Sequence, residues 1–149
     1  MSVQRRFEGT VHEAETCWYD TSAWPLWVDG LDHVVSLQEP WPEIGGSVTW
    51  RSGPAGRGQV TERVISYEAL SGQTVAVGDD SIDGHQMVGF TPADEAVEVV
   101  LTLEYEIKQR NLFTPLVDLL FIRRAMEMSL RATLSGFGAQ LADRRESGL

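Results

Sequence analysis

The chain has 149 residues, 42% hydrophobic and 23% charged, a composition typical of a folded domain rather than of a disordered segment. We expect a single domain over residues 1–149, with an ordered core from about residue 3 to about residue 144. Asp and Glu number 22 against 12 Lys and Arg, a formal net charge of −10. Because binding to a phosphate backbone depends on cationic side chains, this charge excludes nucleic acid from the expected partners.

The sequence also suggests where the protein is located. The first residues, Met-Ser-Val-Gln-Arg-Arg-Phe, lack the apolar stretch of a signal peptide. No run approaches the roughly 18–20 apolar residues of a membrane span. The lone Cys17 cannot form an internal disulfide, and we expect it to be a buried, inert thiol. We therefore expect a cytoplasmic protein with no integral membrane association.

The N-terminal third predicts two strands separated by two short helices. Asp20, Thr21 and Ser22 offer caps for the second helix, and Pro40-Trp41-Pro42 ends the second strand. The predicted elements are a strand over Val3–Val11, a helix over His12–Tyr19, a helix through Trp24, Trp27 and Val28, and a strand over His33–Glu39.

From Ser47 onward, strands alternate with turns rich in Gly, Pro, Asp and Ser. One turn is expected over residues 92–95. The strands before that turn are predicted over Ser47–Ser52, Gln59–Tyr67, Gln73–Gly78 and Gly84–Phe90. The strand after it has the clearest alternation, which predicts one face on a core and one largely in water. Its apolar face comprises Val97, Val99, Leu101, Leu103, Tyr105 and Ile107.

A long helix is predicted at the C-terminal end, with Thr114 as N-cap and Pro115 at its first position. It runs to about Arg144, and Gly136 and Gly138 are expected to weaken it and could bend it. On a helical wheel, one apolar arc of roughly 100° holds its core side chains. These are Leu116, Leu119, Leu120, Met126, Leu130, Leu134, Phe137 and Leu141.

This order of elements predicts an α+β domain in which the helix packs on the apolar face of an antiparallel sheet. A sheet curved around a helix leaves a concave, mostly apolar space, and small molecules bind in such spaces. The sequence resembles the START-like or SRPBCC superfamily (helix-grip, birch-pollen-allergen-like), in its bacterial polyketide cyclase/dehydrase branch. The residues that carry the resemblance are Trp18, Trp24, Trp27, Glu43-Ile44-Gly45, Val60–Val64, Gly84–Pro92, Leu119–Arg124 and Ser129-Leu130.

The resemblance extends from about Val3 to Leu141 and depends on the order of elements rather than on any one motif. It implies a helix-grip fold, with about seven strands wrapped around the C-terminal helix. It also implies a hydrophobic cavity between sheet and helix. Members of the superfamily carry lipids, bind hormones or quinones, or cyclise polyketides, and the fold does not choose among these activities.

Two charged residues fall inside the apolar arc of the long helix. Arg123 and Glu127 are four residues apart and can pair along the helix. They either face the cavity and orient a polar group of the ligand, or form an ion pair at a wet edge.

Tyr105 and His85 are, with Arg123, the candidate catalytic residues. Tyr105 lies on the apolar face of its strand, so its hydroxyl either donates to a ligand or is satisfied by the protein itself. His85 is the best acid/base candidate by its ordinary pKa if it points inward, although the alternation does not decide between His85 and Gln86.

The expected cavity lining combines aromatic, aliphatic and charged side chains. For Trp27 and Trp50, a place in the pocket and a place in the core are equally compatible with the sequence. The predicted lining comprises Trp27, Trp50, Phe90, Val99, Leu101, Leu103, Tyr105, Arg123, Met126, Glu127 and Leu130.

No metal site or cofactor is predicted. The histidines His12, His33 and His85 have no ligand spacing, and the glycine-rich segment 53–58 lacks the Lys-Ser/Thr of a phosphate loop. No Gly-x-Ser-x-Gly nucleophile elbow occurs.

A second apolar stripe on the long helix, Val117, Phe121 and Met128, lies away from the core arc. Such a stripe marks a partner surface or is covered by another element, and we expect a possible homodimer contact there. For the function, the first hypothesis is binding of a small, mostly hydrophobic ligand such as a lipid, quinone or polyketide. The second is a polyketide cyclase or dehydratase using the same cavity, and the third is an interaction protein whose pocket is filled by its own side chains.

Overall fold

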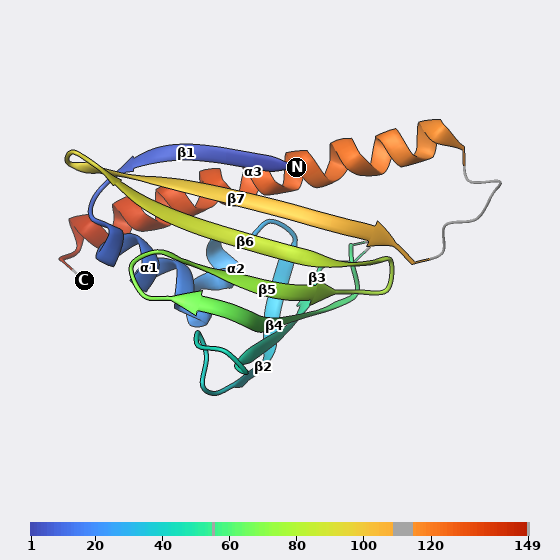
Figure 1. Cartoon of the computed structure of the whole chain (residues 1–149), viewed down its shortest axis with the longest axis horizontal. Helices are drawn as coiled ribbons and strands as arrows, with labels where there is room; N and C mark the ends of the chain where they lie inside the picture. The colour runs from blue at the N-terminus through green and yellow to red at the C-terminus, as the bar shows by residue number, and fades with distance from the viewer. Residues whose placement is uncertain (55, 109–114, 149) are drawn as a thin grey trace.

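The computed structural model describes residues 1–54, 56–108 and 115–148 (Figure 1). One seven-stranded antiparallel sheet has the order β1-β7-β6-β5-β4-β3-β2. Its strands are β1 (Ser2–Glu8), β2 (Leu31–Gln38), β3 (Ser47–Ser52), β4 (Gln59–Glu68), β5 (Gly72–Gly78), β6 (Ile82–Ala93) and β7 (Ala96–Ile107). The helices are α1 (Val11–Tyr19), a 3-10 turn (Thr21–Ala23), α2 (Trp24–Trp27) and α3 (Leu116–Glu146).

This arrangement confirms the predicted order of elements and the α+β class. The sheet curves, and α3 runs along it, with α1 and α2 beside the C-terminal half of α3 (Figure 1). Successive strands from β2 to β7 are neighbours in the sheet, whereas β1 pairs with β7 at the far edge. The two edge strands are therefore β1 and β2, and α3 contacts the β1 edge.

The first strand is shorter than predicted, because a helix cap interrupts it. The Thr10 hydroxyl accepts a hydrogen bond from the backbone N–H of Glu13 (3.1 Å), and the Glu13 carboxylate accepts one from the Thr10 N–H (2.9 Å). This capping box starts α1 at Val11, so the predicted extension of the strand to Val11 is wrong.

The β6 strand is longer than predicted and passes through Pro92. Pairing with β5 ends at Gly89, so the ring of Pro92 interrupts no hydrogen-bond ladder on that side. The turn is consequently two residues, Asp94 and Glu95, rather than four, and Asp94 adopts a positive φ of 58°.

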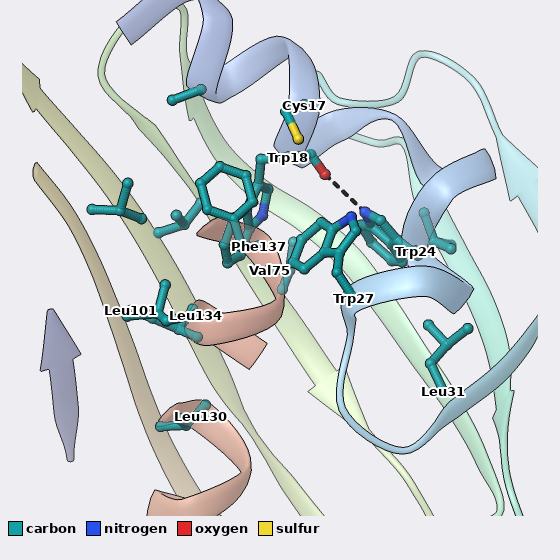
Figure 2. Close-up of a cluster of buried hydrophobic side chains, with 14 of the residues drawn as sticks. Cys17, Trp18, Trp24, Trp27, Leu31, Val75, Leu101, Leu130, Leu134 and Phe137 are labelled. Atoms are coloured by element: carbon teal, nitrogen blue, oxygen red, sulfur yellow. Dashed lines mark hydrogen bonds between the residues drawn. The ribbon is translucent and has the colours of Figure 1, made fainter. Parts of the chain in front are cut away.

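The core is rich in aromatic side chains. Figure 2 shows the rings of Trp18, Trp27 and Phe137 gathered between α1, α2 and α3. The Trp18 ring centroid lies 5.0 Å from that of Trp27 and 5.1 Å from that of Phe137, and the Trp27 and Phe137 centroids are 5.2 Å apart. All five tryptophans are buried, and the predicted inward face of β7 is buried from Val97 to Leu103.

Only the second half of α3 buries the predicted apolar arc. Leu130, Leu134, Phe137 and Leu141 are buried, but Leu116 and Leu120 are 71% and 57% exposed, so their predicted place in the core is wrong. The first half of the helix extends past the N-terminus of β1 (Figure 1), where the cluster of Figure 2 no longer covers it.

The beginning of α3 and its glycines also differ from the prediction. Pro115 is the N-cap rather than the first helical residue, and Thr114 lies outside the described residues. The helix continues through both glycines to Glu146. A Cβ at Gly136 would lie 2.6 Å from the carbonyl oxygen of Trp27, and one at Gly138 would overlap the ring of Phe7. These glycines therefore permit close packing.

We expect Phe137→Ala to lower the free energy of unfolding by about 3–5 kcal/mol, because it removes the ring that joins α3 to Trp18 and Trp27. Urea denaturation measures the change. Phe121→Ala is the matched control on the same helix, because Phe121 is 74% exposed and its truncation should change stability by less than about 0.5 kcal/mol. Equal losses in the two variants would contradict this account of the core.

Candidate functional site

A small space of about 40 Å³ lies between the sheet, α2 and the second half of α3. Four indole rings and four aliphatic side chains line it, together with six polar or charged side chains. The lining residues are Trp18, Trp24, Trp27, Val28, Asp29, Trp50, Arg57, Glu62, Val77, Gln86, Leu101, Ser129, Leu130 and Thr133. The space, called here the central cavity, has room for a few water molecules or a small part of a ligand.

Glu62 brings a carboxyl group into this wall. It occupies an inward position of β4 between Val60 and Val64, and it is 7% exposed. The indole N–H of Trp50 donates a hydrogen bond of 2.7 Å to its Oε2. Burial raises the pKa of Glu62 above its ordinary value, and the hydrogen bond from Trp50 and the charge of Arg57 offset part of that effect.

Arg57 joins the loop between β3 and β4 to the turn before β6. Its Nε donates a 2.6 Å hydrogen bond to Oδ2 of Asp79, and its guanidinium lies 5.6 Å from the ring centre of Trp50. Burial by itself would raise the pKa of Asp79. Hydrogen bonds from Arg57 and from the N–H groups of Ser81 and Ile82 outweigh it and hold the pKa below its ordinary value.

Two fully buried polar atoms of the cavity-lining side chains have no hydrogen-bond partner among the described residues. They are Nε1 of Trp27 and Nη2 of Arg57, both of which are buried. Buried donors are nearly always paired with protein or water, because an unmade hydrogen bond costs about 1–3 kcal/mol. The side chains that line the central cavity therefore include two buried hydrogen-bond donors that can bind an acceptor.

Hydrogen bonds from the other side of the cavity hold α3 to the chain after α2. The backbone N–H of Asp29 donates to Oγ1 of Thr133 (3.1 Å), and the Ser129 hydroxyl donates to the Asp29 carboxylate (2.8 Å). All three residues line the cavity. They fix the register between α3 and the segment that carries Trp27.

An open groove of about 640 Å³ lies between the end of β7 and the first half of α3. Its lining includes Leu103 and Tyr105 of β7 and Leu119, Leu120 and Arg123 of α3. On the inward face of β7, Leu103 follows Leu101, which lines the central cavity. The groove and the cavity therefore lie next to each other along the same strand.

The residues predicted from the sequence divide between these two places. Trp27, Trp50, Leu101 and Leu130 line the central cavity, whereas Leu103, Tyr105 and Arg123 line the groove. Phe90 and Val99 belong to the buried core and to neither lining, and Met126 is half-buried against that core.

Glu127 and His85 lie away from both places. Glu127 accepts a hydrogen bond of 3.1 Å from Arg131, one turn further along α3, so among the described residues the pairing with Arg123 that the sequence offered as one alternative does not form. His85 is exposed and lines a hollow on the outer face of the sheet, opposite Glu104 of β7. Its neighbour Gln86 points inward and lines the central cavity.

Glu62, Arg57 and Gln86 were not predicted as site residues. The phase of alternation could have identified Glu62, which shares the phase of Val60 and Val64. For Gln86 the sequence left the choice with His85 open, and the structure shows that Gln86 shares the inward phase of Ile82, Val88 and Phe90. A charged or amide side chain at a core position of a strand is costly and therefore informative. Arg57 lies in a loop, where no periodicity exists to place it.

The comparisons with known proteins agree with this geometry. A family model described as "Polyketide cyclase / dehydrase and lipid transport" matches residues 1–142. The chain belongs to this family. The predicted superfamily and its helix-grip fold are therefore confirmed, and no curated protein sequence matches the chain.

Solved structures show the same fold at low identity. A conserved protein from Geobacillus kaustophilus has a TM-score of 0.77 at 12% identity, over 96% of this chain and 95% of its own. A START superfamily protein from Mycobacterium smegmatis has a TM-score of 0.75 at 10% identity, over 96% and 97%. The di-domain ARO/CYC protein StfQ from the steffimycin biosynthetic pathway has a TM-score of 0.75 at 16% identity, over 99% and 52%.

Other sequence expectations concern the surface and the thiol of this family member. Cys17 is buried, and burial raises its pKa to about 11, which confirms the predicted buried thiol. Val117, Phe121 and Met128 are 62–74% exposed, and the homodimer contact expected there stays a prediction. Within the described residues, no helix combines the length and apolar character needed to cross a membrane.

We expect Glu62→Gln to become more stable relative to the wild type as the pH rises above about 4.5. The folded protein holds the Glu62 proton more tightly than the unfolded chain does, because burial raises the pKa of Glu62. As the pH rises from the ordinary pKa of 4.5 towards the raised pKa, the free energy of unfolding of the wild type therefore falls. The amide of Glu62→Gln does not titrate, so the variant does not lose this stability.

Urea denaturation from about pH 4 to about pH 8 measures the difference. Glu104→Gln, on the exposed outer face of β7, is the control and should follow the wild type. Parallel curves for Glu62→Gln and the wild type would show that the Glu62 carboxyl titrates normally in the folded protein.

Proposed function

We propose that the protein binds a small, mostly hydrophobic molecule between its sheet and α3. The observation that carries the proposal is the central cavity, a space beside the buried hydrophobic core that is lined by four indoles and four aliphatic side chains, with polar groups among them. The family includes lipid transport by its description, which is consistent with such a ligand. Apolar walls supply affinity by removing ligand surface from water.

The volumes indicate how such a ligand would be accommodated. Pockets for small molecules usually measure about 300–1,000 Å³, which the groove of about 640 Å³ reaches and the central cavity of about 40 Å³ does not. In our proposal the ligand enters through the groove beside Tyr105 and Leu119. Its innermost part reaches the central cavity past Leu101 and Leu130. Arg123, at the groove, would lie near the outer end of the ligand.

Native mass spectrometry of freshly purified protein, with solvent extraction, tests the proposal first. Thermal-shift screening of sterols, fatty acids, quinones and aromatic polyketides follows. A ligand at about 100-fold its Kd adds about 2.7 kcal/mol to the free energy of unfolding, so a true ligand should raise Tm by several degrees.

Two variants localise the site. We expect Leu130→Phe, which fills the central cavity, to reduce or abolish the ligand-induced shift measured from its own baseline. Leu116→Phe is the matched control on the same helix, because Leu116 is 71% exposed, and it should keep the shift. A panel in which no compound stabilises the protein would contradict the proposal and move attention to the exposed stripe with Phe121.

A second candidate function is a cyclase or dehydratase that uses the same cavity. The observation that favours it is Glu62, a buried carboxyl with a raised pKa on the cavity wall, which is the kind of group that transfers protons in active sites. Turnover of a polyketide substrate that is lost in Glu62→Gln while binding survives would support the enzyme. Tyr105→Phe, in the groove, tests the tyrosine predicted from the sequence in the same assay.

A further inference from the structure

We propose that Trp27 and Arg57 form a donor pair that binds one uncharged oxygen of the ligand, and that Glu62 and Asp29 exclude a ligand carboxylate from the same place. The inference rests on the proposed function, because it specifies the inner end of the ligand that the central cavity accepts. It concerns the chemical class of that end: a keto or hydroxyl group on an apolar body.

Two cavity-lining side chains have a buried hydrogen-bond donor without a partner in the part of the chain that the structure describes. Nε1 of Trp27 and Nη2 of Arg57 are buried and lack a partner among the described residues, and both side chains line the central cavity. Trp27 is 5% exposed and its Nε1 is buried, so bulk water does not serve as the partner of this donor. The other indoles with an assigned bond already donate: Trp24 to the Trp18 carbonyl, and Trp50 to Glu62 (Figure 2 shows the former).

Much of the wall of the central cavity is apolar. The indoles of Trp18, Trp24, Trp27 and Trp50 surround the cavity with flat apolar surface, and Leu101 and Leu130 face them. An acceptor oxygen at the donor pair therefore has to be carried on an apolar skeleton. In the empty protein a water molecule fits the space of about 40 Å³, and the ligand oxygen would take its place.

The charged side chains that line the central cavity are Arg57, Glu62 and Asp29. Arg57 is the cation among the lining residues, and its positive charge is already balanced by Asp79 at 2.6 Å. Glu62 adds a buried carboxyl group to the same wall, and Asp29 adds an exposed one that already accepts a hydrogen bond from Ser129. A ligand carboxylate would meet these acids without a free cation to compensate for its lost hydration, whereas a neutral carbonyl or hydroxyl needs hydrogen-bond donors alone.

Three probes of nearly equal size separate these contributions: acetophenone with a keto oxygen, isopropylbenzene without one, and benzoate with a carboxylate. Binding is followed by NMR through the indole N–H resonances, and the Trp27 signal is assigned on the wild-type protein from its contacts with neighbouring side chains in nuclear Overhauser spectra. We expect acetophenone to move the Trp27 indole resonance of the wild-type protein, and isopropylbenzene to move it far less. Benzoate should bind weakest at neutral pH.

Variants then test each group. Trp27→Phe keeps an aromatic ring but removes the donor, and it should weaken acetophenone about tenfold while leaving isopropylbenzene within about twofold. Trp41→Phe is the matched control, because the Trp41 indole donates to the Tyr19 carbonyl and does not line the cavity. Glu62→Gln should strengthen benzoate relative to isopropylbenzene at a pH high enough to ionise Glu62, because the amide removes the repulsion between the two carboxylates.

The outcomes separate this inference from the proposed function. The donor pair is refuted if Trp27→Phe weakens the binding of acetophenone and of isopropylbenzene equally, or if acetophenone does not shift the Trp27 indole resonance. Either result would leave the proposed binding of a hydrophobic ligand in the cavity unaffected. If benzoate binds as tightly as acetophenone to the wild type, the exclusion of carboxylates is refuted. If none of the three probes binds, the ligand-binding cavity itself is refuted, and the donor pair with it. The wild-type spectra decide the question even if Trp27→Phe fails to fold.

Discussion

The close approach of α3 to α2 at Gly136 is the constraint on which the interior depends. Without a side chain at residue 136, the helix backbone lies against the carbonyl of Trp27. The ring of Phe137 then reaches both Trp18 and Trp27, and Thr133 and Ser129 reach Asp29. The same approach brings the helix that carries Leu130 close to Trp27, and both residues line the central cavity, so the geometry of the cavity depends on the absence of a side chain at residue 136.

The polar cluster in this interior is poorly explained by stability. Glu62, Trp50, Arg57 and Asp79 link two strands, a loop and a turn. Replacing buried charged groups by well-packed apolar ones is often neutral or stabilising, so such a cluster is weak evidence of a structural role. A role in binding is favoured because the cluster lies beside the central cavity. The description of the family, which includes lipid transport, is consistent with that role.

Much of the fold could be predicted from the sequence, because its signals are local. The alternation in β7 and the turn residues between the strands are properties of neighbouring residues, and the family resemblance supplied the way in which sheet and helix combine. The boundaries that failed, at Val11 and Pro92, depend on a cap and on where a neighbouring strand ends.

The candidate site was harder to predict, because cavities arise between distant elements. The helical wheel treated α3 as uniformly covered, and only the tertiary structure shows that Leu116 and Leu120 lie beyond the core. Four lining residues, among them Trp27 and Leu130, were predicted, since large side chains on the inward faces necessarily surround whatever space remains. Arg57 depends on the conformation of a loop, for which the sequence offers no period.

The uneven burial of α3 has a consequence for how the protein moves. The last turns, from Leu130 to Leu141, are held by the aromatic cluster, so their amide hydrogens exchange with solvent through global unfolding. The first turns bury little apolar surface, and they can unwind while the remainder stays folded. One continuous helix thus has two local stabilities, and the less stable part forms one wall of the groove.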